Sequence, residues 1–356
     1  MANWMIYGAY GYTGILVIEE AIKRGHRPML AGRSEAKLQP LATRYDLPYR
    51  AFALNDSDAI AAELHDIDIL YHAAGPFIYT SDPMIRACLQ SKTHYVDITG
   101  EIPVFENTFS YDQQAHEAGI ALISGVGFDV IPTDCMARYI ADKTPNATHL
   151  DIAIAAISKT SAGTAKSGIE LADGGGQVRR DGELQPFPFG QGARKIRFND
   201  RERRVMPIPW GDLATAYRTT GIPNITTYMA FPAALIALSR LTGGMIPYVM
   251  SSRTVKNGLL WMVDKVVKGP DENARKSAKS FVWVRATDDA GNINEAWLET
   301  LEGYDFTAVA GVRVIEAMLQ GIESQTPIIG ATTPALAFGA DFVLDLPKTQ
   351  RFDHLP

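Results

Sequence analysis

Three glycines near the N-terminus are spaced in a way that suits phosphate binding. Gly8, Gly11 and Gly14 lie directly between a short apolar run, Trp4–Tyr7, and a segment with helical apolar spacing, Thr13–Arg24. The loop and the start of the helix also contain Tyr10, Tyr12 and Thr13. Small residues permit a tight turn and close approach of a pyrophosphate, which the N–H groups at the helix start can bind. The pattern predicts a dinucleotide-binding loop, the alternative being a tight turn without a ligand.

The end of the second predicted strand indicates which dinucleotide would bind. Enzymes that use NAD usually carry an acid about 20 residues after the glycines, where it binds the ribose. Here Arg33 lies 19 residues after Gly14 (33 − 14), and Ser34 follows it. A guanidinium binds phosphate oxygens in a bidentate manner, so both residues, with Lys37 nearby, favour the 2′-phosphate of NADP(H). The alternatives are a solvated arginine and a helix-capping serine.

The ends of the later strands should meet this loop, because ligands of such sheets bind outside the carboxyl ends of the strands. The residues that we expect to contact the cofactor there are Ala73, Ala74, Gly75, Pro76, Phe77, Thr99 and Gly100. The candidates for proton transfer are Tyr79, Asp97, Glu101 and Asp129. The seven histidines form no metal-binding pair, so we expect no metal site.

Two other patterns have simpler interpretations. Tyr139 and Lys143 match the YxxxK motif of short-chain dehydrogenases, but with 14 tyrosines such a pair is expected about once by chance. Its alternative is an ordinary amphipathic helix. His72 lies in an apolar strand and is more often a hydrogen-bonded core residue than a base.

The elements that position these residues follow from the apolar pattern. Six short apolar runs alternate with helical segments up to residue 145, which predicts an α/β Rossmann domain with a doubly wound parallel sheet over 1–145. Residues 146–330 read as an α+β substrate or dimerisation domain with a mostly antiparallel sheet, including a hairpin over 281–304. We expect the C-terminal segment, 331–356, to return to the first domain.

Composition excludes several classes of protein. The net charge is −6, from 34 Lys and Arg against 40 Asp and Glu, which argues against a nucleic-acid partner. Two cysteines and no signal-peptide pattern favour the cytoplasm. Residues 219–239 carry no charge, but Pro223 and Pro232 argue against a membrane-spanning helix. A helix that lies on a membrane, or that lines an apolar pocket, remains an option.

Several of these motifs occur together in one family. The chain resembles the saccharopine dehydrogenase-like oxidoreductases, and within them the bacterial branch called trans-acting enoyl reductases. The resemblance rests on residues 8–14, 31–34, 74–77, 95–101 and 127–134, and in the second half on 209–212, 220–224 and 333–339. It implies an NADP-binding Rossmann domain and a reaction by hydride transfer.

The substrate class is inferred from the second half. Saccharopine carries three carboxylates, so its pocket should be rich in arginine. In this chain the basic residues between Arg194 and Arg204 are interleaved with acids, which is typical of an exposed strand pair. Residues 225–250 are apolar and aromatic, which favours a lipid-like or polyketide-like ligand with an enoyl bond. The alternatives are a saccharopine-type enzyme acting on a C–N bond, a short-chain-dehydrogenase-like carbonyl reductase and a non-catalytic NADP-binding scaffold. We expect a homodimer.

Overall fold

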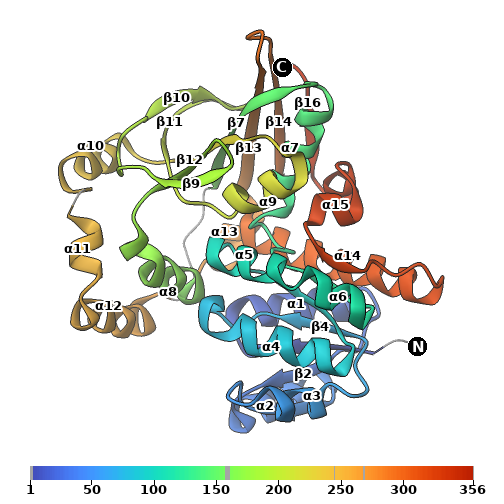
Figure 1. The fold of residues 1–356 in the computed structure, drawn as a ribbon. Coiled ribbons are helices and arrows are strands. Elements are labelled where there is room, and N and C mark those ends of the chain that lie inside the picture. The colour runs from blue at the N-terminus through green and yellow to red at the C-terminus, as the bar shows by residue number, and fades with distance from the viewer. Residues whose placement is uncertain (1–2, 157–160, 244, 268, 356) are drawn as a thin grey trace. The chain divides into compact units, whose positions relative to one another are not determined.

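The computed structural model describes residues 3–156, 161–243, 245–267 and 269–355, and these form two compact units (Figure 1). The first unit comprises Met1–Asp129 and Tyr304–Ala337, and the second comprises Val130–Gly303 and Phe338–Pro356. This division differs from the expected boundaries at 145 and 330. Residues 130–145 lie with the second unit, and residues 304–330 lie with the first.

The first unit contains the predicted parallel sheet, in the order β15-β6-β5-β4-β1-β2-β3. Every strand pair in it is parallel, and β1 and β4 are buried along their whole length, as expected for strands covered on both faces. The chain leaves β1 in one direction and later returns to its other side as β4, so the switch point lies between these two strands. The strands are β1 (Trp4–Tyr7), β2 (Met29–Gly32), β3 (Tyr49–Ala51), β4 (Ile69–His72), β5 (His94–Asp97), β6 (Ala121–Ile123) and β15 (Gly330–Thr332).

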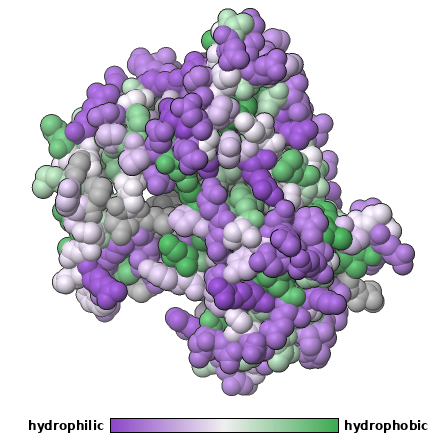
Figure 2. All heavy atoms as spheres, viewed as in Figure 1, coloured by the Kyte–Doolittle hydropathy of each residue, from purple (hydrophilic) through white to green (hydrophobic). Residues whose placement is uncertain are grey.

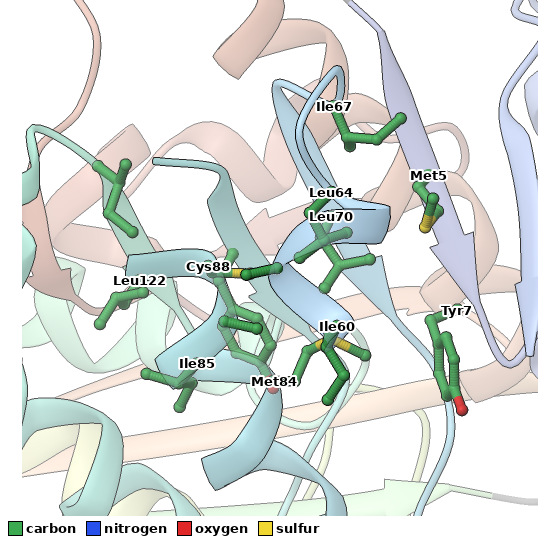
Figure 3. Packing of buried hydrophobic residues seen from close by; sticks show 14 of the residues in the cluster. Met5, Tyr7, Ile60, Leu64, Ile67, Leu70, Met84, Ile85, Cys88 and Leu122 are labelled. Carbon is green, nitrogen blue, oxygen red and sulfur yellow. The ribbon is translucent and has the colours of Figure 1, made fainter. Parts of the chain in front are cut away.

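Helices cover both faces of this sheet. Alternate residues of the strands pack into a cluster with α3 and α4, among them Met5 and Leu70 (Figure 3). Tyr71 lies on the opposite face, against α14. A Cβ atom at Gly311 of α14 would lie 2.5 Å from the Tyr71 hydroxyl, so glycine permits this close packing. The helices are α1 (Tyr12–Lys23), α2 (Glu35–Tyr45), α3 (Ser57–Glu63), α4 (Phe77–Ser91), α5 (Ile102–Ser110), α6 (Asp112–Ala118) and α14 (Gly303–Glu323).

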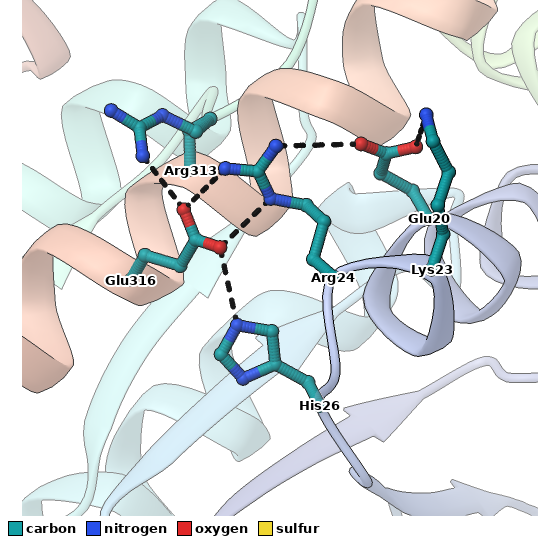
Figure 4. A network of polar contacts seen from close by, with 6 residues as sticks. All are labelled: Glu20, Lys23, Arg24, His26, Arg313 and Glu316. Atoms are coloured by element: carbon teal, nitrogen blue, oxygen red, sulfur yellow. Dashed lines mark hydrogen bonds and ion pairs between the residues drawn. The ribbon is translucent and has the colours of Figure 1, made fainter.

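An ion-pair cluster joins the end of α1 to α14 (Figure 4). The Glu316 carboxylate accepts two hydrogen bonds from Arg24, at 2.8 and 2.7 Å, and one from Arg313 at 2.8 Å. His26 Nε2 lies 3.2 Å from it. The hydrogen bonds from Arg24 contribute most to lowering the pKa of Glu316, to about 2. These contacts explain why a segment some 290 residues away in the sequence belongs to the first unit.

The C-terminal region divides between the two sheets. β15 adds to the first sheet in parallel with β6, and Asp112 accepts a hydrogen bond from the Ala331 N–H at 2.8 Å. Residues 350–352 form β16, which pairs with β14 in the second sheet. The expected return to the first domain therefore applies to residues 331–337, whereas residues 338–356 lie with the second unit, where β16 extends the antiparallel sheet.

The second unit is built on a mixed, mostly antiparallel sheet in the order β10-β11-β12-β7-β13-β14-β16, with β8 and β9 attached to β12. Only the β7–β12 pair in this path is parallel. The helix over residues 131–142 packs on β7, β13 and β14, which assigns it to this unit. The strands are β7 (Ala147–Ala156), β8 (Gln177–Arg180), β9 (Glu183–Pro186), β10 (Arg194–Arg197), β11 (Glu202–Pro207), β12 (Asn224–Ala230), β13 (Lys279–Asp288), β14 (Ile293–Leu301) and β16 (Gln350–Phe352).

The apolar run over residues 150–157 predicts a strand, and it corresponds to β7; Ile157 lies outside the described residues. Residues 179–218 hold strand-like runs and turn residues, but their end is helical, because residues 212–220 form α9. The helices are α7 (Ile131–Asp142), α8 (Ala162–Leu171), α9 (Asp212–Thr220), α10 (Ala233–Thr242), α11 (Ile246–Met250), α12 (Arg253–Val266) and α13 (Glu272–Ser277). The short helix α15 (Pro334–Phe338) lies almost entirely in the first unit.

Two helices of the first unit differ from what the sequence pattern predicts. Residues 105–117 have the pattern of one helix but form parts of two, α5 and α6, which meet at Tyr111. The helical pattern over residues 82–90 belongs to α4, which begins earlier, at Phe77. Across the described residues, none of the helices combines the length and the hydropathy that crossing a bilayer requires.

Candidate functional site

The glycine loop makes a tight turn between β1 and α1. Gly8 has φ +93°, and its N–H donates to the Ala31 carbonyl at 2.9 Å. A Cβ atom there would lie 2.7 Å from the Ala73 backbone, and one at Gly14 would lie 2.4 Å from the Gly8 carbonyl oxygen. Gly11 is different, because its φ of −73° suits any residue and its Cβ atom would approach Gly8 only to 3.1 Å. Gly8 and Gly14 are thus required by the turn itself, whereas Gly11 is not.

Two helices, α1 and α4, begin at this edge of the sheet, and their N-termini differ. The N-terminus of α1 has no side-chain cap and no acid in its first turn. At the start of α4, the Glu101 carboxylate accepts hydrogen bonds from the N–H groups of Phe77 and Ile78, at 3.0 and 2.7 Å. A helix N-terminus attracts anions, so α1 is open to a phosphate whereas α4 already holds a carboxylate. Glu101, a predicted proton donor, lies here as a helix cap.

The end of β2 presents a basic and aromatic surface. Arg33 is exposed, and Ser34 precedes α2 without making a capping hydrogen bond from its side chain. The Tyr10 ring lies across Gly32, where a Cβ atom would come within 2.7 Å of it. Lys37 places its Nζ 5.4 Å from the centre of the Tyr10 ring. The residues predicted for a 2′-phosphate therefore lie together beside the glycine loop.

Asp97 is buried at the end of β5, and both oxygens of its carboxylate accept hydrogen bonds. Its carboxylate accepts hydrogen bonds from the Tyr95 and Ser124 hydroxyls, both at 2.8 Å, and from the N–H groups of Thr99 and Gly125 at 2.9 and 3.0 Å. Burial raises the pKa of Asp97 to about 6, against the lowering effect of these hydrogen bonds. The geometry suits a residue that joins the ends of β5 and β6 more than one that exchanges a proton with a ligand.

Asp129 follows β6 and lies beside the turn after β5. A Cβ atom at Gly100 would be 2.8 Å from Asp129 Oδ2, so glycine leaves room for the carboxyl. Burial raises the pKa of Asp129 to about 7. The side chain is half-buried, and within the described part of the chain its carboxylate accepts no hydrogen bond. A carboxyl with this pKa can act as a proton donor at neutral pH.

The other predicted residues surround the same strand ends. Ala73, Ala74, Gly75 and Pro76 connect β4 to α4, next to Gly8. Tyr79 is 62% exposed in the first turn of α4, and Thr99 is buried with its hydroxyl oxygen 3.1 Å from the Glu101 N–H. His72 is buried, with Nε2 3.1 Å from the Thr80 hydroxyl, and burial lowers its pKa to about 4. A neutral core histidine agrees with the simpler interpretation of His72.

Helix α14 supplies contacts that no sequence pattern indicated. The Thr307 hydroxyl accepts a hydrogen bond from the Phe128 N–H at 3.0 Å, and a Cβ atom at Gly127 would meet Thr307 at 2.9 Å. Tyr304 packs edge-on against Tyr12 of the glycine loop, with ring centres 5.0 Å apart. These residues lie about 180 or more positions from their partners, and no local motif marks them.

The YxxxK pair is accounted for by a surface cluster of the second unit. The Tyr139 hydroxyl donates to Asp353 at 2.6 Å, Lys143 Nζ lies 2.7 Å from the same carboxylate, and Arg351 stacks 3.4 Å from the Tyr139 ring centre. Neither residue lies in the unit that holds the glycine loop. In the described ranges, no three His, Cys, Asp or Glu side chains gather in a way that would hold a metal ion.

Comparison with known proteins agrees with this geometry. Residues 4–123 match the model of the saccharopine dehydrogenase NADP-binding domain. Over its whole length the fold is similar to apo saccharopine dehydrogenase (L-Glu forming) from Saccharomyces cerevisiae, with a TM-score of 0.64, 13% identity, and coverage of 99% of this chain and 100% of that one. At this identity the likeness concerns the fold alone.

Curated relatives match part of the chain. A probable mitochondrial saccharopine dehydrogenase-like oxidoreductase of Arabidopsis thaliana is 28% identical over 213 residues, 52% of this chain and 47% of that protein. A trans-acting enoyl reductase of Mycobacterium ulcerans is 28% identical over 146 residues, 38% of this chain and 34% of that protein. The matches thus span less than half the length of either relative. Residues 4–123 are thus similar to the saccharopine dehydrogenase NADP-binding domain, and parts of the chain are similar to saccharopine dehydrogenase-like oxidoreductases and trans-acting enoyl reductases.

Proposed function

We propose that this protein is an NADP(H)-dependent oxidoreductase that reduces an enoyl or related unsaturated bond of a hydrophobic ligand. The observation that carries the proposal is the Asp129 carboxyl, with its pKa of about 7, beside Gly100 at the strand ends of the nucleotide-binding domain. Ligands of doubly wound sheets bind at this edge, so a proton donor there lies where chemistry on a bound cofactor would take place.

The residues of the first unit fit a dinucleotide with a 2′-phosphate. The uncapped N-terminus of α1, after Gly11, would hold the pyrophosphate through backbone N–H groups. Arg33 and Ser34 would hold the 2′-phosphate, and Tyr10 would pack near the adenosine end. NADPH, when bound, supplies a hydride to the acceptor.

The chain supplies the proton that completes the reduction. One carbon of the unsaturated bond gains the hydride, and the neighbouring atom gains a proton from the Asp129 carboxyl, which is left as a carboxylate. Solvent then restores the proton. Burial raises the pKa of Asp129 to about 7, so a substantial fraction of the carboxyl would carry the proton at neutral pH before the ligand arrives. Asp97 would act through structure, by fixing the turns after β5 and β6.

Charge pairing in the second unit supports a hydrophobic ligand over saccharopine. Arg194 lies 3.0 Å from Asp151, Lys195 lies 2.8 Å from Glu202, and Arg203 donates to Asp200 at 2.7 Å. Each of these cations lies beside an acid, although Arg194 shares Asp151 with Arg285. A ligand with three carboxylates would have to compete with those acids.

Arg33→Ala tests the cofactor preference. Losing a charge-assisted contact to the 2′-phosphate should weaken NADPH binding about 10- to 100-fold, and NADH binding should stay nearly unchanged. Nicotinamide fluorescence measures both affinities. Arg44→Ala is the matched control, because Arg44 is an exposed arginine of the same helix region that pairs with Glu19. Equal losses for the two cofactors would contradict the assignment.

The ligand class is tested with two acceptors. A long-chain trans-2-enoyl thioester should oxidise NADPH in the presence of the protein and, together with NADP, should raise its unfolding temperature by mass action. Saccharopine should do neither. NADP reduction that depends on saccharopine, with no response to the enoyl thioester, would overturn this function in favour of C–N chemistry. NADPH binding without turnover of either compound would instead favour a scaffold.

A further inference from the structure

Three successive helices of the second unit, α10, α11 and α12, expose large apolar side chains (Figure 1). We call these residues the apolar face: Leu235, Leu238, Leu241, Tyr248, Trp261 and Val266. Leu241 is 84% exposed, Tyr248 82% and Val266 71%. In Figure 2, hydrophilic residues cover most of the visible surface. Apolar residues of α10 lie at the left edge of that surface. Single exposed apolar residues are ordinary, but a concentration of this kind marks an interaction surface.

The helices are amphipathic, so the exposure follows from their sequence. In α10 the three leucines recur at intervals of three residues on one side, while Ile236 is buried on the other. In α12, Lys265 follows Trp261 by four residues and places its Nζ 4.8 Å from the indole ring centre. A tryptophan beside a lysine, flanked by exposed aliphatic residues, suits the boundary between water and lipid.

The charge of this segment is opposite to that of the chain. Residues 231–270 contain five basic residues and one acid, Asp264, for a net charge of +4 (5 − 1), whereas the whole chain carries −6. The basic residues are Arg240, Arg253, Lys256, Lys265 and Lys268. An anionic surface would therefore be attracted to these helices although the protein as a whole is acidic.

We propose that the apolar face docks on an anionic lipid bilayer, with α10–α12 lying in the interface. The leucines, Tyr248 and Trp261 would enter the boundary between headgroups and acyl chains. The exposed Arg253 and Lys265 would contact lipid phosphates, whereas Lys256 already pairs with Glu170. A second copy of the chain fits this face less well. In a two-fold dimer the same segment would meet itself, which would bring two +4 segments together.

The test is flotation of the full chain with vesicles of phosphatidylcholine containing phosphatidylglycerol, and with vesicles of phosphatidylcholine alone. The wild-type protein should float with the anionic vesicles, and increasing salt should weaken binding. The triple variant Leu241→Asp, Tyr248→Asp, Trp261→Asp should lose at least tenfold in vesicle affinity. All three side chains are exposed, so the fold should be retained. Arg253→Glu with Lys265→Glu should lose the preference for anionic lipid.

Ile293→Asp is the matched control. Ile293 is an exposed apolar residue at the β13–β14 hairpin, away from α10–α12 in the sequence, and its replacement should leave flotation unchanged. NADPH affinity should be the same in all variants, which separates this proposal from the cofactor assignment. Absence of flotation, or equal flotation of the triple variant and the wild type, would overturn it. A change from dimer to monomer in the triple variant, without vesicle binding by the wild type, would show that a second copy covers the face.

Discussion

Asp129→Asn should lower the rate of NADPH-dependent reduction by about 10²- to 10⁴-fold, the contribution typical of a positioned proton donor. The amide has nearly the same shape but cannot deliver the proton, so NADPH affinity should change little. Stopped-flow measurement of hydride transfer and fluorescence titration of NADPH separate the two effects. A variant that keeps its full turnover would exclude Asp129 as the donor.

The proposed role of Asp129 also predicts the direction in which the reduction rate changes with pH. Only the protonated carboxyl can donate, so kcat/KM for reduction should be highest below pH 7 and fall as pH rises through about 7, the pKa of Asp129. The variant should lack this fall.

Stability provides a second readout for the same residue. The folded-state pKa is raised, so the stabilising effect of the neutral acid is full below the unfolded value of 3.8 and is lost as pH rises through about 7. At pH 8 the wild type carries a half-buried charge that Asp129→Asn lacks. The variant should therefore unfold at a higher temperature than the wild type at pH 8, and the difference should shrink towards pH 5.

Asp97→Asn is the informative contrast. Asp97 accepts four hydrogen bonds, and an amide would turn part of that acceptor set into donors facing N–H and O–H groups. The expected result is a lower unfolding temperature at neutral pH. Loss of turnover with unchanged stability in this variant would indicate that Asp97, and not Asp129, exchanges the proton.

Gly11→Val should weaken NADPH binding at least about 100-fold, or roughly 2.7 kcal/mol, because a branched side chain would project where the backbone must approach the pyrophosphate. The backbone at Gly11 suits valine, and its Cβ atom would lie 3.1 Å from the Gly8 carbonyl oxygen, a tight contact that a shift of a few tenths of an ångström relieves. The fold should therefore remain, which circular dichroism and thermal unfolding would establish.

The choice among the three glycines decides whether this experiment is informative. A side chain at Gly8 or Gly14 would collide with the backbone at 2.7 or 2.4 Å and would disturb the turn even without a ligand. Gly168→Val serves as the control, because a Cβ atom there meets nothing within 4 Å and the residue lies in the second unit. Normal NADPH binding by a folded Gly11→Val protein would remove the glycine loop from the site.

The sequence alone was sufficient to predict the parallel sheet whose strand ends carry the candidate site. The apolar runs at residues 4–7 and 69–72 are short, bounded and buried in the structure, because a parallel sheet covered on both faces needs continuous apolar strands. The hairpin of β13 and β14 was equally predictable, since alternation over two segments separated by Asp-Ala-Gly-Asn is a local pattern.

Strand ends are harder to interpret from sequence, because a carboxylate there can serve a ligand or the backbone. Asp97 is the last residue of β5, Glu101 lies in the turn after β5, and Asp129 lies in the segment after β6. Tertiary contacts separate them: Asp97 holds two turns together, Glu101 caps α4, and Asp129 lies against Gly100 with its carboxyl unbonded within the described chain. Which of these carboxyls accepts hydrogen bonds depends on the packing of neighbouring loops.

Local sequence patterns alone predicted the glycine loop, the basic residue after β2 and the alternation of strands and helices in the first half of the chain. Each of these features depends on neighbours within one turn or one strand. Only the tertiary structure decided that α7 packs on the second sheet, that α14 belongs to the first unit, and that Thr307 and Tyr304 support loops about 180 or more residues earlier. The reason is physical: these contacts bury apolar faces that several partners could cover equally well, and the choice among them depends on how the whole chain packs.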